Sequence, residues 1–81
     1  MSIKIDKNKR EICISLNKKF YDTKAVKESL ADFKGICEGK IKEDRCLINI
    51  ILKPKEKNML NIIGYEFCNY ALGLMKNKML V

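Results

Sequence analysis

The sequence predicts an α+β fold, a two-layer sandwich in which a four-stranded, mostly antiparallel sheet carries two helices on one face. Two observations predict it. A pair of segments in which apolar and polar residues alternate is followed by a segment with helical spacing, and the same succession then occurs again, which gives the order ββαββα. A chain of 81 residues also buries too little surface for two cores, so residues 1–81 are expected to form a single domain.

The first two strands are expected on either side of a turn at residues 6–9. Apolar residues alternate with polar ones at residues 3–5 and again at residues 12–16. This is the pattern of a hairpin that buries one face. Polar residues at 17–19 then end the second strand.

The first helix is expected at residues 23–34. Asp22 or Thr23 is its N-cap, because either side chain can accept a hydrogen bond from a free N–H group of the first turn. Gly35 stands where a residue in the left-handed conformation is expected to end the helix. The apolar residues that recur at helical spacing are Val26, Leu30 and Phe33.

The third and fourth strands differ strongly in apolar character. Residues 37–42 alternate around Gly39 and predict a weak, exposed strand. Residues 46–52 are apolar almost without interruption, which predicts a central strand with both faces at least partly covered. Pro54 is expected to end it, because proline cannot donate to the ladder.

A second helix is predicted as one uninterrupted element at about residues 56–79. Its core stripe is expected to consist of Leu60, Ile63, Phe67, Ala71 and Leu74. Other apolar residues flank or oppose this stripe, namely Met59, Ile62, Tyr65, Tyr70, Leu72, Met75, Met79 and Leu80. They indicate either a partner surface or a helix that packs against both the sheet and the first helix. Gly64 and Gly73 favour close approach of another helix.

The net charge of +7 arises from 17 basic residues, of which only Arg10 and Arg45 are arginine. Proteins that bind nucleic acids favour arginine for contacts to phosphate and guanine. The lysine clusters at residues 7–10, 18–19 and 53–57 are therefore interpreted as a solvated surface in preference to a nucleic-acid site. No apolar run of about 18 residues and no secretory signal is present, so we expect no membrane span and a cytoplasmic location.

No constellation of catalytic or metal-binding residues is found in the sequence. Histidine is absent, no Cys-x-x-Cys pair occurs, and the glycines form no phosphate-binding loop. The four cysteines are expected to be small buried hydrophobic residues without disulfides; they are Cys13, Cys37, Cys46 and Cys68. We therefore expect a protein that is not an enzyme, with no cofactor and no metal.

Several short motifs follow one another in a recognisable order across residues 12–74. They are a tyrosine at the start of the first helix, a strong strand that ends in Leu-Lys-Pro-Lys, and a helix with an acid-Phe-x-Asn core followed by leucine. The residues that carry the motifs are Tyr21, Ala25, Val26, Phe33, Ile48, Ile50, Leu52, Lys53, Pro54, Lys55, Glu66, Phe67, Asn69 and Leu72. This order resembles the HxsD-like family of His-Xaa-Ser system proteins. The resemblance implies a small non-catalytic accessory protein that acts beside radical-SAM enzymes in the modification of a ribosomally made peptide.

The residues themselves predict a binding or adaptor module for a peptide or a partner enzyme. Its site is expected at the exposed sheet edge around residues 39–42 or on the second helix, where an acidic segment would suit the positive charge. The candidate partner-binding residues are Lys40, Lys42, Tyr65, Glu66, Asn69 and Leu72. One alternative is a nucleic-acid- or ribosome-associated module that uses the lysine clusters. Another is a homodimeric structural or interaction domain built on the apolar second helix.

Overall fold

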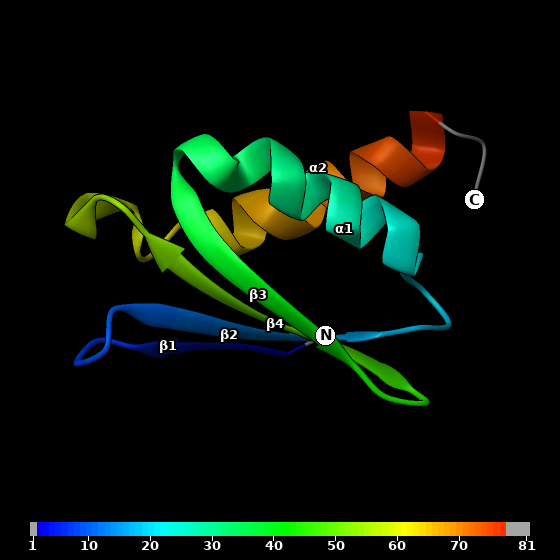
Figure 1. Ribbon diagram of the computed structural model, residues 1–81, viewed down its shortest axis with the longest axis horizontal. Coiled ribbons are helices and arrows are strands. Elements are labelled where there is room, and N and C mark those ends of the chain that lie inside the picture. Colours follow the sequence, from blue (N-terminus) through cyan, green and yellow to red (C-terminus); the bar gives the residue numbers. More distant parts are fainter. Residues whose placement is uncertain (1, 78–81) are drawn as a thin grey trace.

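A computed structural model describes residues 2–77 and has two layers, a sheet and a pair of helices (Figure 1). The strands are β1 (Ser2–Asp6), β2 (Glu11–Asn17), β3 (Cys37–Glu43) and β4 (Leu47–Pro54). The helices are α1 (Thr23–Asp32) and α2 (Ile63–Asn77), with short 3₁₀ turns at Phe33–Gly35 and Lys57–Met59. The predicted fold class and the order ββαββα are confirmed.

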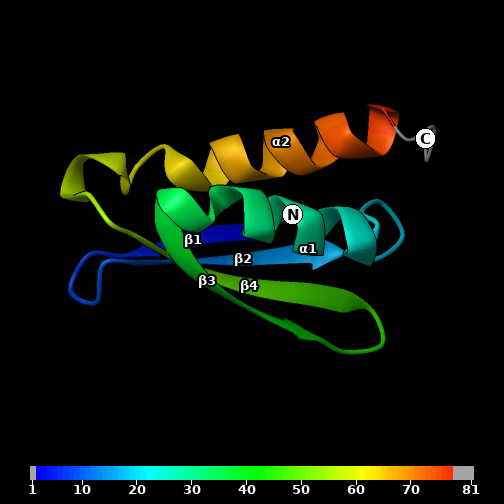
Figure 2. The ribbon, with the colours of Figure 1, turned by 45° about the horizontal axis from the view of Figure 1, so that its top comes forward.

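All strand pairs in the sheet are antiparallel, and the spatial order is β1-β2-β4-β3. The strongest apolar strand, β4, therefore lies in the centre beside β2, as the sequence predicts. The weak strand β3 lies at one edge of the sheet and β1 at the other. Helix α1 lies on the side of β3, and α2 lies on the side of β1 (Figure 2).

Among the described residues, helices pack on only one face of the sheet. The inward side chains of the two central strands are fully buried, and they are Ile12, Ile14, Leu16, Ile48, Ile50 and Leu52. The outward side chains of Leu47 and Ile51 remain 37% and 39% exposed. These side chains are thus partly covered, in line with the expectation that both faces of β4 are at least partly covered, although helices pack only on the inner face. Both helices lie on the same side of the sheet, so they contribute no side chains to the outer face.

Helix α1 begins as predicted and ends differently. Asp22 is the N-cap, and its carboxylate accepts a hydrogen bond from the N–H of Ala25 at 3.1 Å. The predicted left-handed ending at Gly35 is wrong, because no described glycine has a positive φ. The helix instead tightens into the 3₁₀ turn, where Ile36 N–H donates to the carbonyl of Phe33. This turn keeps the Phe33 ring in the core.

Helix α2 starts later than the sequence predicts. After β4, the chain makes a 3₁₀ turn that places Met59 and Leu60 against the core, and the α-helix begins only at Ile63. A Cβ at Gly64 would lie 3.2 Å from Ile12 Cγ2 and 3.3 Å from Ile3 Cγ2. The glycine therefore serves close approach to the sheet and not to another helix, which corrects the prediction.

The other helix glycine and the core stripe also differ from the prediction. A Cβ at Gly73 would meet nothing within 4 Å, so Gly73 serves no close approach within residues 2–77. The stripe ends on Met75, which is buried, and Leu74 is only half-buried. Met79 and Leu80 lie outside the described residues.

Candidate binding edge of the sheet

Among residues 2–77, strand β3 has a free edge, and the hydrogen-bonding groups along it can be assigned from the ladder. The N–H of Lys55 donates to Ile36 and the N–H of Asp44 donates to Leu47, each at 3.0 Å. Hydrogen-bonded pairs alternate along an antiparallel ladder, so Glu38, Lys40 and Lys42 are the β3 residues that bond to β4. The residues whose N–H and C=O groups point to the free edge are therefore Cys37, Gly39, Ile41 and Glu43.

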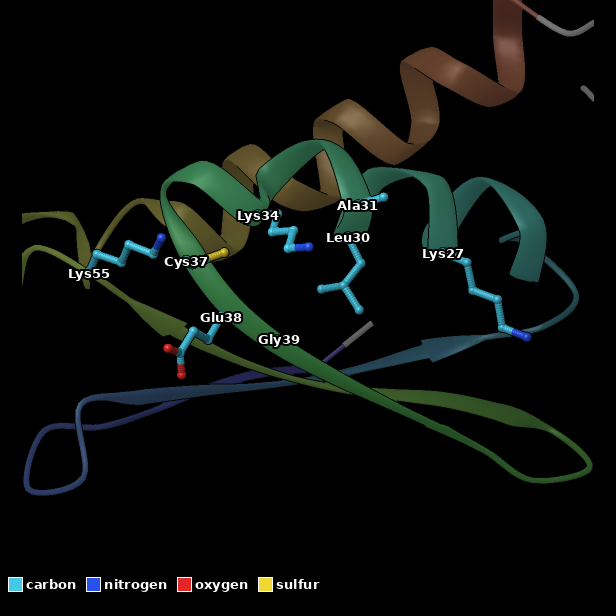
Figure 3. Close-up of a pocket in the computed structure, with 8 residues that line it drawn as sticks. All are labelled: Lys27, Leu30, Ala31, Lys34, Cys37, Glu38, Gly39 and Lys55. Atoms are coloured by element: carbon cyan, nitrogen blue, oxygen red, sulfur yellow. The ribbon is translucent and has the colours of Figure 1, made fainter.

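A groove of about 550 Å³ runs between α1 and this edge (Figure 3). Its apolar part comes from the side chains of Leu30, Ala31 and Cys37 and from the backbone of Gly39. A Cβ at Gly39 would overlap Leu30 Cδ1, so the absence of a side chain there lets Leu30 rest directly on the strand. The groove consequently lies beside strand backbone that is not covered by its own side chain.

Positive charge surrounds the groove and the strand. Lys27, Lys34 and Lys55 line the groove, while Lys40 and Lys42 project from the opposite face of β3. Two glutamates, at positions 38 and 43, stand against these five lysines. The region is therefore positive overall, as an acidic ligand requires.

Glu43 is already engaged within the protein. Its carboxylate accepts a hydrogen bond from Lys18 Nζ at 3.0 Å and lies 3.6 Å from Lys27 Nζ. The hydrogen bond from Lys18 is the main cause that lowers the pKa of Glu43, with the charge of Lys18 and of Lys27 acting in the same direction. Within residues 2–77, Lys40 and Lys42 have no carboxylate at ion-pair distance, so their ammonium groups remain available to a partner.

The predicted site residues fall into two separate groups. Lys40 and Lys42 are exposed on the edge strand β3, where the sequence places them. Tyr65, Asn69 and Leu72 share one flank of α2, with Tyr65 and Asn69 exposed and Leu72 half-buried. Since α2 lies on the side of β1, the structure does not bring the two groups together (Figure 2).

Glu66 belongs to a shallow groove of α2 that is distinct from the β3 groove. Glu66 and Asn69 line it together with Phe33, Tyr70 and Leu74. The Tyr70 hydroxyl donates a hydrogen bond to the Asp32 carboxylate, and this bond is the main cause that raises the pKa of Tyr70. The Phe33 and Tyr70 rings also pack edge to face, with their centroids 5.3 Å apart. These contacts tie α2 to α1 and leave Glu66 exposed at the surface.

The inner wall of the β3 groove consists of residues that the sequence does not predict as site residues. Leu30, Ala31 and Lys34 come from α1, and they reach β3 only through tertiary packing. One local signal was present, because the alternation of residues 37–41 puts Gly39 at an inward position, where a strand normally carries a side chain that packs. A glycine at such a position indicates close approach from the other layer.

All four cysteines are free thiols, and two of them contradict the expectation of burial. Cys37 and Cys68 are buried, whereas Cys13 and Cys46 are exposed because they lie on the open face of the sheet and in the turn before β4. Burial raises the pKa of Cys68 to about 11. Within residues 2–77, no three His, Cys, Asp or Glu side chains are grouped so as to hold a metal ion. No helix in this part of the chain is long and apolar enough to span a membrane.

Comparison of the chain with known families, proteins and structures finds no match. No family model matches the chain, and neither a curated protein nor a solved structure matches it.

Proposed function

We propose that this chain is a non-catalytic binding module that holds an extended acidic segment of a partner polypeptide by strand addition to β3. The observation that carries the proposal is the free edge of β3, which lies beside a groove bordered by lysines. Main-chain hydrogen bonds supply affinity in this mode of recognition, and a few side-chain contacts supply selectivity.

Backbone geometry and charge both support this occupant. Four alternate residues of β3 direct N–H and C=O groups to the free edge, where a fifth strand of the sheet would satisfy them. Each exposed lysine–carboxylate pair contributes only about 0.2–1 kcal/mol. Charge therefore selects and steers the ligand, while the backbone ladder holds it.

A second copy of this chain fits the same edge less well. Two β3 strands side by side would bring ten lysines and four glutamates of the two edge regions together, twice the five lysines and two glutamates of one copy. Lysines on an edge strand are a common barrier to such self-pairing. We therefore favour a different, acidic polypeptide over a homodimer formed through β3.

The resemblance to the HxsD-like family suggests where such a polypeptide would be found. A radical-SAM enzyme or its precursor peptide is the partner that the resemblance implies, in the cytoplasm. An acidic extended segment in either molecule would have the required chemistry.

A nucleic-acid-associated module is the second candidate, and one observation favours it. Two of the three lysine clusters meet at one end of the molecule, where Lys7, Arg10 and Lys57 line a pocket of about 390 Å³. Phosphate binding there would weaken steeply with salt, because bound counterions are released. The described part of the outer sheet face carries no aromatic side chain on which a base could stack, so this face adds no stacking to phosphate contacts at the pocket.

The proposal is tested by selection from a phage-displayed library of random heptapeptides, a length that matches the seven residues of β3. The wild-type protein is expected to enrich acidic sequences. Lys40→Glu/Lys42→Glu should lose binding to them by at least about tenfold, or 1.4 kcal/mol, because repulsion replaces attraction.

Lys4→Glu/Lys9→Glu is the matched control, since it makes the same charge change at the β1 side of the sheet, and it should retain binding. All three proteins should show the same unfolding midpoint. Equal loss in both double variants, or no enrichment of acidic peptides, would reject the β3 edge.

A further inference from the structure

The two faces of β3 differ in chemistry, and this difference restricts the ligand residue by residue. Cys37, Gly39 and Ile41 face the helices, while Lys40 and Lys42 face outward. In a strand added to the edge, each residue lies opposite one β3 residue and shares its face of the sheet. Successive ligand side chains therefore alternate between the groove and the outer face.

At Gly39 the place of a strand side chain is taken by Leu30, which packs on the strand backbone beside the groove. Gly39 carries no side chain, so a ligand residue directly opposite meets only Leu30, Ala31 and strand backbone. Residues directly opposite each other on neighbouring strands normally have their Cβ atoms about 4.5–5.5 Å apart. Because Gly39 has no Cβ, a ligand residue opposite it would have no side chain of β3 beside its own. A large apolar side chain would pack against Leu30 and fill the groove.

The charged side chains on the outer face of β3 determine which ligand positions should be acidic and which uncharged. Lys40 and Lys42 have no carboxylate at ion-pair distance among residues 2–77, whereas an acid opposite Glu38 would be repelled. Opposite charges placed directly across a strand pair are favourable and like charges are not. The ligand should thus carry acids opposite the two lysines and an uncharged residue opposite Glu38.

We infer that the β3 edge selects an antiparallel segment with the pattern acid, apolar, acid, large apolar, uncharged, in the direction from amino to carboxyl end. This inference rests on the proposed strand addition. In this register the first acid faces Lys42, the second acid faces Lys40, and the large apolar residue enters the groove opposite Gly39. An antiparallel ligand continues the pairing of every neighbour in the sheet.

The test uses a capped seven-residue peptide, Thr-Glu-Val-Glu-Trp-Thr-Thr, as long as β3. The protein contains no tryptophan, so the peptide indole reports its own surroundings. Binding should shift its emission to shorter wavelength as the ring enters the groove. A scrambled control, Thr-Glu-Glu-Trp-Val-Thr-Thr, has the same composition, but its adjacent acids cannot both face outward.

The patterned peptide should bind at least about tenfold more tightly than the scrambled one. Ala31→Tyr should remove this preference and the emission shift, because Ala31 is an exposed groove residue and the larger ring occupies the space. Equal binding of the two peptides, sensitive to Lys40→Glu/Lys42→Glu, would overturn the register and leave strand addition intact. Binding of neither peptide would count against strand addition itself.

Discussion

The two edge strands of the sheet, β1 and β3, differ in length and in the number of residues whose backbone groups face the free edge. Strand β1 has five residues and β3 has seven. The N–H of Lys18 donates to the carbonyl of Cys46, and the alternation that follows leaves only Ile3 and Ile5 of β1 facing outward along the edge. Strand β3 leaves four such residues. A longer free ladder makes β3 the better template for an added strand.

A glycine stands at the helix–sheet contact near each edge, but in different layers. Gly64 belongs to α2 and lets the helix descend onto Ile3 and Ile12, which closes the β1 side. Gly39 belongs to the strand, and Leu30 of α1 reaches over it. Gly64 allows the helix to pack closely on the sheet. Gly39 has no side chain, so strand backbone stays accessible beside the groove. The predictions below test this difference.

Truncation of side chains under the two edges should have unequal effects. Ile12 is fully buried beneath α2, and Ile12→Ala should lower the free energy of unfolding by about 2–5 kcal/mol. Leu30 is only half-buried beside the groove, so Leu30→Ala should cost about 1–2 kcal/mol. Urea unfolding measures both values. An equal cost at the two positions would mean that the β3 side is as closed as the β1 side.

The two glycines of α2 provide a matched pair. Gly73→Ala should stabilise the protein by about 1 kcal/mol, because alanine is the better helix former and its Cβ meets nothing within 4 Å. Gly64→Ala has the same propensity gain but presses against Ile3 and Ile12, and overpacking costs about 1–3 kcal/mol. It should therefore be the less stable variant in thermal unfolding. Equal stabilisation by both would show that α2 does not rest tightly on β1 and β2.

The stability of the α2 side should also depend on alkaline pH. Burial raises the pKa of Cys68 from 9.0 to about 11. Unfolding therefore releases a proton between these values, so the contribution is complete below pH 9 and is lost as pH rises through about 11. The unfolding free energy of Cys68→Ala should fall less steeply over this range than that of the wild type. Parallel pH profiles would show that the thiol is not shielded.

The sequence predicts those parts of the fold that are encoded in local spacing. Alternation around Ile12 and Ile14 gave the buried face of β2, and Asp22 was among the two expected caps. The late start of α2 and the ending of α1 at Phe33 were missed, because packing of the turns against the core determines them. Lys40 and Lys42 could be placed on an exposed edge from their strand pattern alone.

The groove itself could not be predicted in the same way. It forms because α1 lies on the side of β3, and this arrangement depends on the sheet order β1-β2-β4-β3. Contacts between Leu30 and Gly39 arise only after both layers are assembled. The spacing of residues along the chain does not predict these contacts, apart from the inward position of Gly39.

Amide hydrogen exchange along β3 tests the central claim most directly. In the free protein, the N–H groups of Gly39 and Ile41 should exchange quickly, while those of Lys40 and Lys42 should be protected by β4. Saturation with the tightest acidic heptapeptide from the library should protect Gly39 and Ile41 and leave Lys40 and Lys42 nearly unchanged. Protection that instead appears at Ile3 and Ile5 of β1, or no change at Gly39 and Ile41, would contradict strand addition at β3.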